Sequence, residues 1–238
     1  MPQLNYPEYR RDYKGEPITY VENGEMKSLF VNPRAFPYDR SVGSAIVLGN
    51  GLSRTLPDIQ LILKYNNKRV AEGYKTTYAC NAAYRDTPAD YYIVKDRIFF
   101  SEIPTDQYNK MFVSNDMWVT YRDTNLIPYF YYMDSGSTGA YLAAFDGHKK
   151  VFLIGFDGSD DKTNLNIYAN SLGYDDNTFN HHTHHNYLFE VCRVYSNVDF
   201  YRVRTPHSYD YSDRLNTLPN YHEVNVRDAI LLLSLIHI

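Results

Sequence analysis

The chain has 238 residues, a formal net charge of −4 and a sequence pI near 6.0. This length suits one sizeable domain with its own core, and the mildly acidic balance argues against binding to nucleic-acid duplexes, which usually needs a clustered basic face. The two cysteines, Cys80 and Cys192, lie far apart in apolar stretches, which favours buried thiols in a reducing compartment over a disulfide framework.

The two ends of the chain carry no recognisable targeting signal. The first residues, MPQLNYPEYRRDYKGEP, contain no apolar core of a signal peptide, so secretion is not predicted. The final apolar run, 229–238, is shorter than the roughly 20 residues that span a bilayer, so no transmembrane segment is predicted either. It stops abruptly, and we treat 228–238 as a tail that is either truncated or artefactual. A cytoplasmic location is the resulting expectation.

Residues 1–43 are predicted to form an extended N-terminal arm, because prolines recur along it and no apolar periodicity is sustained. Within the arm, the sequence Glu-Asn-Gly at 22–24 separates two β-rich runs. This pattern predicts one short hairpin over ITYVENGEMKSLFV, residues 18–31.

From residue 44 onward, short runs of branched and aromatic residues alternate with helical patterns. The runs predicted to be strands are 45–49, 76–80, 91–94, 110–114, 150–155 and 198–203. Their near-continuous apolarity is typical of strands covered on both faces, as in a parallel sheet. The sequence therefore predicts an α/β fold for 44–238, a single Rossmann-like domain with a mostly parallel central sheet.

Three helices are expected between these strands. The first follows Pro57, in IQLILKYNNKRVAEG. The second lies in GSTGAYLAAFDGHKK, with Ser137 as N-cap and Gly147 as its stop. The third, HHNYLFEVCRVYSN, spaces its apolar residues as one buried stripe, formed by Leu188, Val191, Cys192 and Tyr195.

The first predicted strand of the sheet runs into a glycine turn with the sequence Gly49-Asn50-Gly51-Leu52-Ser53. Glycines let a backbone approach a phosphate, and helix-turn amides favour anions. Arg54 stands where a dinucleotide fingerprint would have its third glycine, and no Walker lysine follows. The turn is either a mononucleotide site or a plain corner between a strand and a helix.

Polar residues also follow the later strands, where ligands of open α/β sheets bind. A structural turn or a surface ion pair explains each of them taken alone, and a turn is the favoured interpretation of Ser114 and Asn115, but their recurrence at successive strand ends favours a site. They are Asn81 and Arg85, Lys95 and Asp96, Ser114 and Asn115, and Asp157. A long polar stretch from 158 to 180 then follows, which contains Tyr168 and Tyr174 and is typical of a functional loop.

The segment DSGSTGAY, residues 134–141, is a hydroxyl-rich start of a helix. Ser137, Thr138 and Gly139 suit an anion or a sugar held at the helix N-terminus. Ordinary capping by Ser137 explains the same pattern.

The histidine cluster HHTHH, residues 181–185, allows several interpretations. His181 and His185 are four residues apart and could face one metal, but no H-E-x-x-H pattern supports a metal site. One histidine could instead act as a general base, and the cluster could also be a solvated helix start. No metal is assigned.

Taken in order, these motifs resemble the bacterial lipooligosaccharide sialyltransferases and the wider group of Rossmann-like proteins that includes archaeal hydroxymethylpterin pyrophosphokinases. The matching pieces are VLGNGLS, ACNAAY, STGAYLAA, VFLIGFD and the histidine-bearing segment, within roughly 45–203. The arrangement also looks like uncharacterised proteins of marine phage genomes, for which the cytoplasm would be that of an infected bacterial host.

The resemblance implies a nucleotide-sugar-dependent glycosyltransferase that uses no metal or cofactor. Its donor would be a nucleotide sugar such as a CMP-sugar, and its acceptor a glycan or another hydroxyl compound. Residues implied to bind the nucleotide or donor are Gly49, Asn50, Gly51, Ser53, Asn81, Asp96, Ser137, Thr138, Gly139 and Asp157. Those implied to be catalytic are Tyr168, which would stabilise the leaving phosphate, and one of His182, His184 and His185 as general base.

The chain departs from the sialyltransferase pattern in two places. Asp96 stands where that family usually has asparagine, and Gly158 and Ser159 stand where it has a second tyrosine. Two alternatives therefore stay open: a phage structural or assembly protein with a Rossmann-like core and no catalysis, and a nucleotide-dependent pyrophosphokinase. If these residues form one site, we expect Gly51, Asn81, Ser137 and His185 to converge on one cleft.

Overall fold

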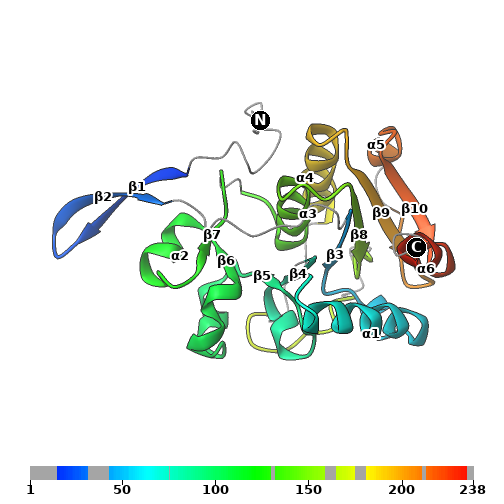
Figure 1. Cartoon of the computed structure of the whole chain (residues 1–238), viewed down its shortest axis with the longest axis horizontal. Helices are drawn as coiled ribbons and strands as arrows, with labels where there is room; N and C mark the ends of the chain where they lie inside the picture. The colour runs from blue at the N-terminus through cyan, green and yellow to red at the C-terminus, as the bar shows by residue number, and fades with distance from the viewer. Residues whose placement is uncertain are drawn as a thin grey trace.

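An eight-stranded sheet, parallel throughout, forms the centre of the computed structural model, which describes residues 15–31, 43–74, 76–129, 132–158, 165–174, 181–210 and 213–234 (Figure 1). In spatial order its strands are β10 (Tyr221–Asn225), β9 (Asp199–Arg204), β8 (Lys150–Ile154), β3 (Ser44–Leu48), β4 (Thr77–Cys80), β5 (Tyr91–Ile93), β6 (Met111–Val113) and β7 (Asn125–Leu126). The predicted α/β fold with a parallel sheet, consistent with a single Rossmann-like domain, is confirmed.

The strand order reverses between β3 and β8. From β3 the chain moves outward through β4, β5, β6 and β7, then returns to the other side of β3 with β8, β9 and β10. Leu48 at the end of β3 pairs with Ile154 at the end of β8, so the loops that follow these two strands start side by side. In open parallel sheets such a switch point leaves a crevice where ligands bind.

Helices cover both faces of the sheet. On one face lie α1 (Pro57–Ala71) and α6 (Val226–Ser234), and on the other α3 (Ser135–Phe145), α4 (His181–Val194) and the short α5 (Asp213–Asn216) (Figure 1). Each face has its own buried apolar cluster. The predicted stripe of α4 is confirmed, because Leu188, Val191, Cys192 and Tyr195 are all buried.

Short helical turns follow several strands. They are η2 (Leu52–Thr55), η3 (Asn81–Arg85), η4 (Arg97–Ser101), η5 (Thr105–Lys110) and the six-residue α2 (Asn115–Thr120). Periodicity did not predict these elements, because turns of four to six residues are too short to show a repeating apolar stripe.

Helix α3 begins two residues earlier than the predicted cap. Its N-cap is Asp134, whose Oδ1 accepts a hydrogen bond from the Ser137 amide at 2.8 Å, so the assignment of Ser137 as N-cap is wrong. A carboxylate at this position satisfies a first-turn amide and complements the helix dipole. The predicted stop is in place, since Gly147 follows the C-cap with φ +97°.

The predicted hairpin is present. Strands β1 (Glu16–Glu22) and β2 (Glu25–Val31) pair antiparallel around Asn23 and Gly24, whose positive φ values of 54° and 79° match a two-residue hairpin turn. The hairpin projects from the body beside β7 and α2 (Figure 1), where Arg122 contacts Glu22 and the ring of Tyr20. The rest of the predicted arm, 1–14 and 32–42, lies outside the described residues.

The C-terminal residues that we set aside as a tail are in part an element of the fold. Helix α6 places Ala229 and Leu233 in the same apolar cluster as α1, with 0% and 3% of their surface exposed. Residues 235–238 lie outside the described residues. In the described part of the chain, no helix combines the length and apolarity needed to cross a bilayer.

The close packing of α3 on β3 depends on Gly139. A Cβ atom at this position would lie 2.8 Å from Val47 Cγ1, in a fully buried contact. Alanine is favoured over glycine inside helices by about 1 kcal/mol, yet we expect Gly139→Ala to lower the free energy of unfolding by about 1–2 kcal/mol because the contact is overpacked. Urea unfolding measures this change. Gly43→Ala is the control, since its Cβ meets nothing within 4 Å; equal effects of the two changes would contradict the prediction.

Candidate functional site

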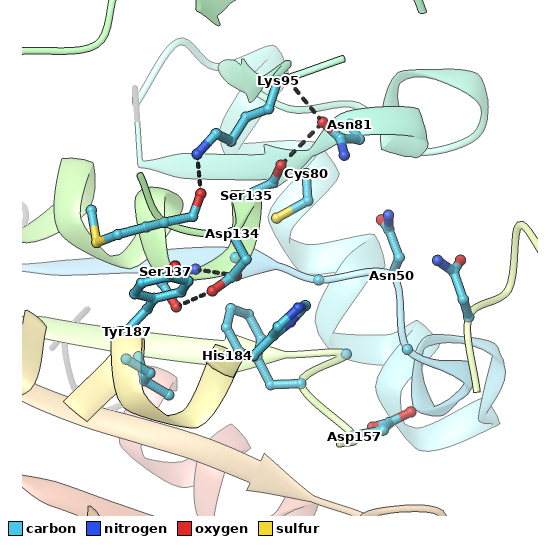
Figure 2. Close-up of a pocket in the computed structure, with 18 of the residues that line it drawn as sticks. Asn50, Cys80, Asn81, Lys95, Asp134, Ser135, Ser137, Asp157, His184 and Tyr187 are labelled. Atoms are coloured by element: carbon cyan, nitrogen blue, oxygen red, sulfur yellow. Dashed lines mark hydrogen bonds between the residues drawn. The ribbon is translucent and has the colours of Figure 1, made fainter. Parts of the chain in front are cut away.

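A cavity of about 700 Å³ lies at the carboxyl edge of the sheet, beside the switch point (Figure 2). It is lined by the residues that follow β3, β4, β5, β6 and β8, by the first turn of α3, by part of the loop 165–174 and by α4. This is the position expected for a ligand site in an open parallel sheet.

Most of the residues predicted for the site line this cavity. They are Gly49, Asn50, Gly51, Asn81, Asp96, Ser137, Asp157, His184 and His185. The set Gly51, Asn81, Ser137 and His185 therefore converges on one cleft, as the sequence analysis required. Ser53, Thr138, Gly139 and Tyr168 do not line it, and the side chain of His182 lies outside the described residues.

The glycine turn after β3 packs against the loop after β8. The amides of Gly49, Gly51 and Leu52 donate to backbone oxygens of Ile154, Gly155 and Leu165 at 2.7–2.9 Å. A Cβ atom at Gly49 would lie 2.5 Å from the Gly155 oxygen, so this turn needs glycine for backbone contact. The Ser53 amide, too, is taken, by Asp157 Oδ2 at 2.7 Å. These amides form hydrogen bonds between the segments that follow β3 and β8, so they do not form a phosphate cradle.

Asn81 connects three parts of the cavity wall. Its Oδ1 accepts hydrogen bonds from the Lys95 amide after β5 and from Ser135 Oγ of α3, both at 3.1 Å, and its Nδ2 donates to Asp96 at 3.3 Å. Its φ of +37° is unusual for a residue other than glycine, and such strain concentrates at functional sites. Asn81 thus holds the ends of β4, β5 and α3 in register around the cavity.

Lys95 supplies a cation within the cavity lining. Its Nζ donates to the Met133 backbone oxygen and lies 5.6 Å from the centre of the Tyr132 ring. Burial lowers the pKa of Lys95 from its ordinary value. We considered this residue as half of an exposed ion pair; the structure turns it instead toward α3, where it can meet an anion.

The N-terminus of α3 opens on the cavity through Ser135, Gly136 and Ser137. Asp134 caps the helix, accepting from the Ser137 amide at 2.8 Å and the Ser137 hydroxyl at 2.6 Å. The first amides of a helix have no acceptor within it, and they carry the positive end of its dipole. Lys95 supplies a cation at this end of the cavity, and the carboxylates of Asp134 and Asp96 lie close to it.

Helix α4 contributes aromatic and imidazole groups to the opposite wall. His184, His185, Tyr187 and Leu188 line the cavity. In Figure 2 the His184 ring lies between the Ser137 end of the cavity and Asp157. The sequence pointed to the histidines but not to Tyr187, whose position in an ordinary apolar helix pattern carried no signal.

Tyr168 belongs to a neighbouring ion-pair network. Its hydroxyl donates to Asp86 Oδ2 at 2.8 Å and accepts from Arg54 Nη1 at 3.2 Å, while Arg54 Nη2 also pairs with Asp86 at 2.9 Å. The prediction that Tyr168 meets the leaving phosphate is corrected on this geometry. Its neighbour in the loop, Tyr174, lines the cavity instead and accepts from Asn50 Nδ2 at 2.6 Å.

Among the described residues, the cavity lining favours neither catalysis by a thiolate nor binding of a metal ion. Burial raises the pKa of the Cys80 thiol, so a reactive thiolate is disfavoured there. Among the described residues, no three His, Cys, Asp or Glu side chains cluster in a way that could hold a metal ion. The groups present suit hydrogen bonding, charge neutralisation and proton transfer.

Asp157 closes the cavity at the end of β8 and is 2% exposed. Arg202 of β9, fully buried, holds this loop by donating to the backbone oxygens of Phe156 and Asp157 at 2.8 and 3.1 Å. Arg202 is itself paired with Glu223 of β10 at 2.7 Å. The sequence did not predict this role of Arg202, because the groups that Arg202 contacts are backbone oxygens far away in the chain.

The chain is an α/β protein with a Rossmann-like parallel sheet and a cavity at its switch point. Comparisons with protein-family models, with curated protein sequences and with solved structures found no match. The functional argument therefore rests on the site itself.

The charge of Asp157 should make stability depend on pH. Burial raises the pKa of Asp157, and hydrogen bonding to the Ser53 side chain and amide only partly offsets this. This group therefore favours folding most when protonated, and the contribution is lost as pH rises through the raised pKa. Asp157→Asn keeps an oxygen for the Ser53 amide and does not titrate. We expect its stability relative to wild type to increase between about pH 4 and pH 7. Urea unfolding across this range is the measurement, and a constant difference would contradict it.

Proposed function

We propose that this protein is a nucleotide-sugar-dependent glycosyltransferase that works without a metal and uses a histidine as general base. The observation that supports this most is the convergence of Lys95, the α3 N-terminus, Asn81 and His184 on one cavity at the switch point. The family resemblance of the motifs in the sequence leads to the same activity.

The phosphate of the donor binds between the α3 N-terminus and Lys95. The first-turn amides and the ammonium group both attract an anion, and neither has to be rearranged when charge develops on the departing nucleotide phosphate. Ser135, already hydrogen-bonded to Asn81, offers a hydroxyl to a phosphate oxygen. In this proposal Lys95 meets the charge of the leaving group, so no metal is invoked for it.

His184 acts as the base. In its neutral form it removes the proton from an acceptor hydroxyl as that oxygen attacks the anomeric carbon. The bond between this carbon and the phosphate oxygen breaks, its electrons remain on the nucleotide phosphate, and the proton stays on the imidazole. His185 lines the same wall but is only 8% exposed, so the proposal assigns the base to the more accessible His184.

The acceptor is a glycan or another hydroxyl compound, and the donor is a CMP-sugar or a related nucleotide sugar. A cytoplasmic location, including that of a phage-infected bacterium, agrees with a substrate of this kind. The competing functions are a non-catalytic assembly protein and a magnesium-dependent pyrophosphokinase; the binding experiment below separates all three.

Calorimetric titration with CMP, UDP and GDP, with and without magnesium, tests the binding step. We expect at least one nucleotide to bind without magnesium, and Lys95→Met to weaken that binding by about tenfold or more, because a charge-assisted contact to phosphate is lost. Lys68→Met is the matched control, since Lys68 lies on α1 with its side chain 73% exposed. Absence of binding by all three nucleotides would rule out both enzyme functions, and binding that requires magnesium would favour phosphoryl transfer.

The catalytic step is tested with His184→Gln. Glutamine keeps hydrogen-bonding capacity but cannot take the proton, so nucleotide affinity should stay nearly unchanged while nucleotide release from CMP-, UDP- or GDP-sugars falls by a factor of about 100 to 10,000. His222→Gln is the control, because His222 lies on β10, away from the cavity lining. Full turnover by His184→Gln would exclude this histidine as the base.

A further inference from the structure

Arg85, the last residue of η3, lies outside the cavity lining and has no part in the proposed mechanism. All of its guanidinium nitrogens donate hydrogen bonds. Nε donates to Glu102 Oε2 at 2.8 Å, Nη1 to Ser171 Oγ at 2.8 Å and Nη2 to the Leu172 backbone oxygen at 3.0 Å. Because a guanidinium is planar and fixes the direction of its donors, Arg85 joins η3 to the loop 165–174 in one defined geometry.

Groups outside this loop orient the guanidinium. The Glu102 oxygen that accepts from Arg85 also accepts from the Tyr84 hydroxyl, so one carboxylate holds two neighbouring side chains. The guanidinium carbon lies 5.8 Å from the centre of the Tyr84 ring and 5.6 Å from that of Phe99, within the range of cation–π attraction. Arg85 is therefore directed toward the loop by η3, η4 and Glu102.

The first half of the loop 165–174 has anchors of its own. The Leu52 amide of the glycine turn donates to this half at 2.7 Å, and the Ile167 amide donates back to the turn at 2.9 Å. The Tyr168 hydroxyl adds a hydrogen bond to Asp86 at 2.8 Å. These bonds join the first half of the loop to the segments that follow β3 and η3.

The second half, 169–174, is a compact turn in which the Tyr174 amide donates to the Ser171 oxygen at 2.8 Å. Arg85 supplies two of the hydrogen bonds that join this turn to the rest of the protein. Asn50 supplies another, to the Tyr174 hydroxyl at 2.6 Å. Loss of Arg85 therefore loosens the second half of the loop and leaves the anchors of the first half in place.

Packing connects this turn to the cavity. Gly173 has φ +82°, and a Cβ atom there would lie 2.7 Å from the Phe99 ring, so the turn fits closely on η4. The centre of the Tyr174 ring lies 5.5 Å from that of Phe99. Since Tyr174 lines the cavity and is 8% exposed, a displacement of the turn changes the shape of the cavity wall.

We propose that Arg85 is a positioning residue for the ligand site. It holds 169–174 against η3 and η4, which places the Tyr174 side chain in the cavity wall. Arg85 does not itself meet the ligand, because it lies outside the lining. The assignment rests on the proposed function for the identity of the ligand, whereas the attachment of the turn by Arg85 is measurable without one.

Hydrogen exchange of the ligand-free protein tests the attachment. In Arg85→Met the aliphatic part of the side chain remains and the donors are lost. We expect amides within 169–174 to exchange about tenfold or more faster, because the turn opens more often. The amides of Leu52 and Ile167 should keep their wild-type rates.

Titration with CMP, UDP and GDP tests the effect on the site. Arg85→Met should weaken the nucleotide that wild type binds by about tenfold, because the wall formed by Tyr174 is no longer held in place. Adding Ser171→Ala to Arg85→Met should change the affinity little further, since both substitutions remove the same contact. A direct contact between Arg85 and the ligand would instead make the two losses add.

Arg193→Met is the matched control, because Arg193 lies on α4, is 46% exposed and pairs with Glu190 of the same helix. It should change neither the exchange of 169–174 nor the nucleotide affinity. If Arg85→Met does not fold, Gly173→Ala displaces the same turn through the contact with Phe99 and should produce both effects.

Wild-type exchange within 169–174, or an unchanged nucleotide affinity despite faster exchange, would overturn the role of Arg85 and leave the proposed function intact. Equally faster exchange at Leu52 and Ile167 would also overturn it, because Arg85 would then stabilise the fold as a whole. Absence of binding by every nucleotide to wild type would remove the proposed function, and with it the role of Arg85 in positioning a ligand.

Discussion

The close approach of the backbones that follow β3 and β8 is the constraint on which this structure depends. Gly49 and Gly155 meet where no Cβ atom could fit, and Asp157 reaches across to the Ser53 amide at 2.7 Å. Arg202, paired with Glu223, anchors the same loop from the two outer strands. A chain of contacts from β10 to β3 thereby holds one wall of the cavity rigid, which a preorganised binding site requires.

The opposite wall is organised around Asn81 and Asp134. Asn81 has a positive φ and accepts hydrogen bonds from the end of β5 and from the start of α3. Asp134 caps the first turn of that helix. The result is a cavity wall in which Lys95 lies close to the carboxylates of Asp134 and Asp96.

The glycine turn shows how one pattern can have two physical causes. Its sequence, Gly49-Asn50-Gly51, is compatible both with a phosphate held by amides and with a tight corner, and the amides prove to be used inside the protein. The side chain between the glycines, Asn50, is the part that lines the cavity with a free acceptor. Tyr168 contacts Asp86 outside the cavity lining while Tyr174 lines the cavity, because loop residues six apart reach different partners once the loop is folded.

The sequence by itself determined the α/β class, the central parallel strands, the hairpin at Asn23-Gly24 and the part of the chain that carries the site, because apolar runs, turn residues and helix stripes are local signals. It did not reveal β7, with two residues, or β10, whose residues Tyr-His-Glu-Val-Asn lie at a partly exposed edge. Only the tertiary structure decided that Asp134 caps α3, that Lys95 turns toward it, and that Arg202 supports Asp157. Those arrangements depend on contacts between segments far apart in the chain, for which a single sequence carries no local pattern.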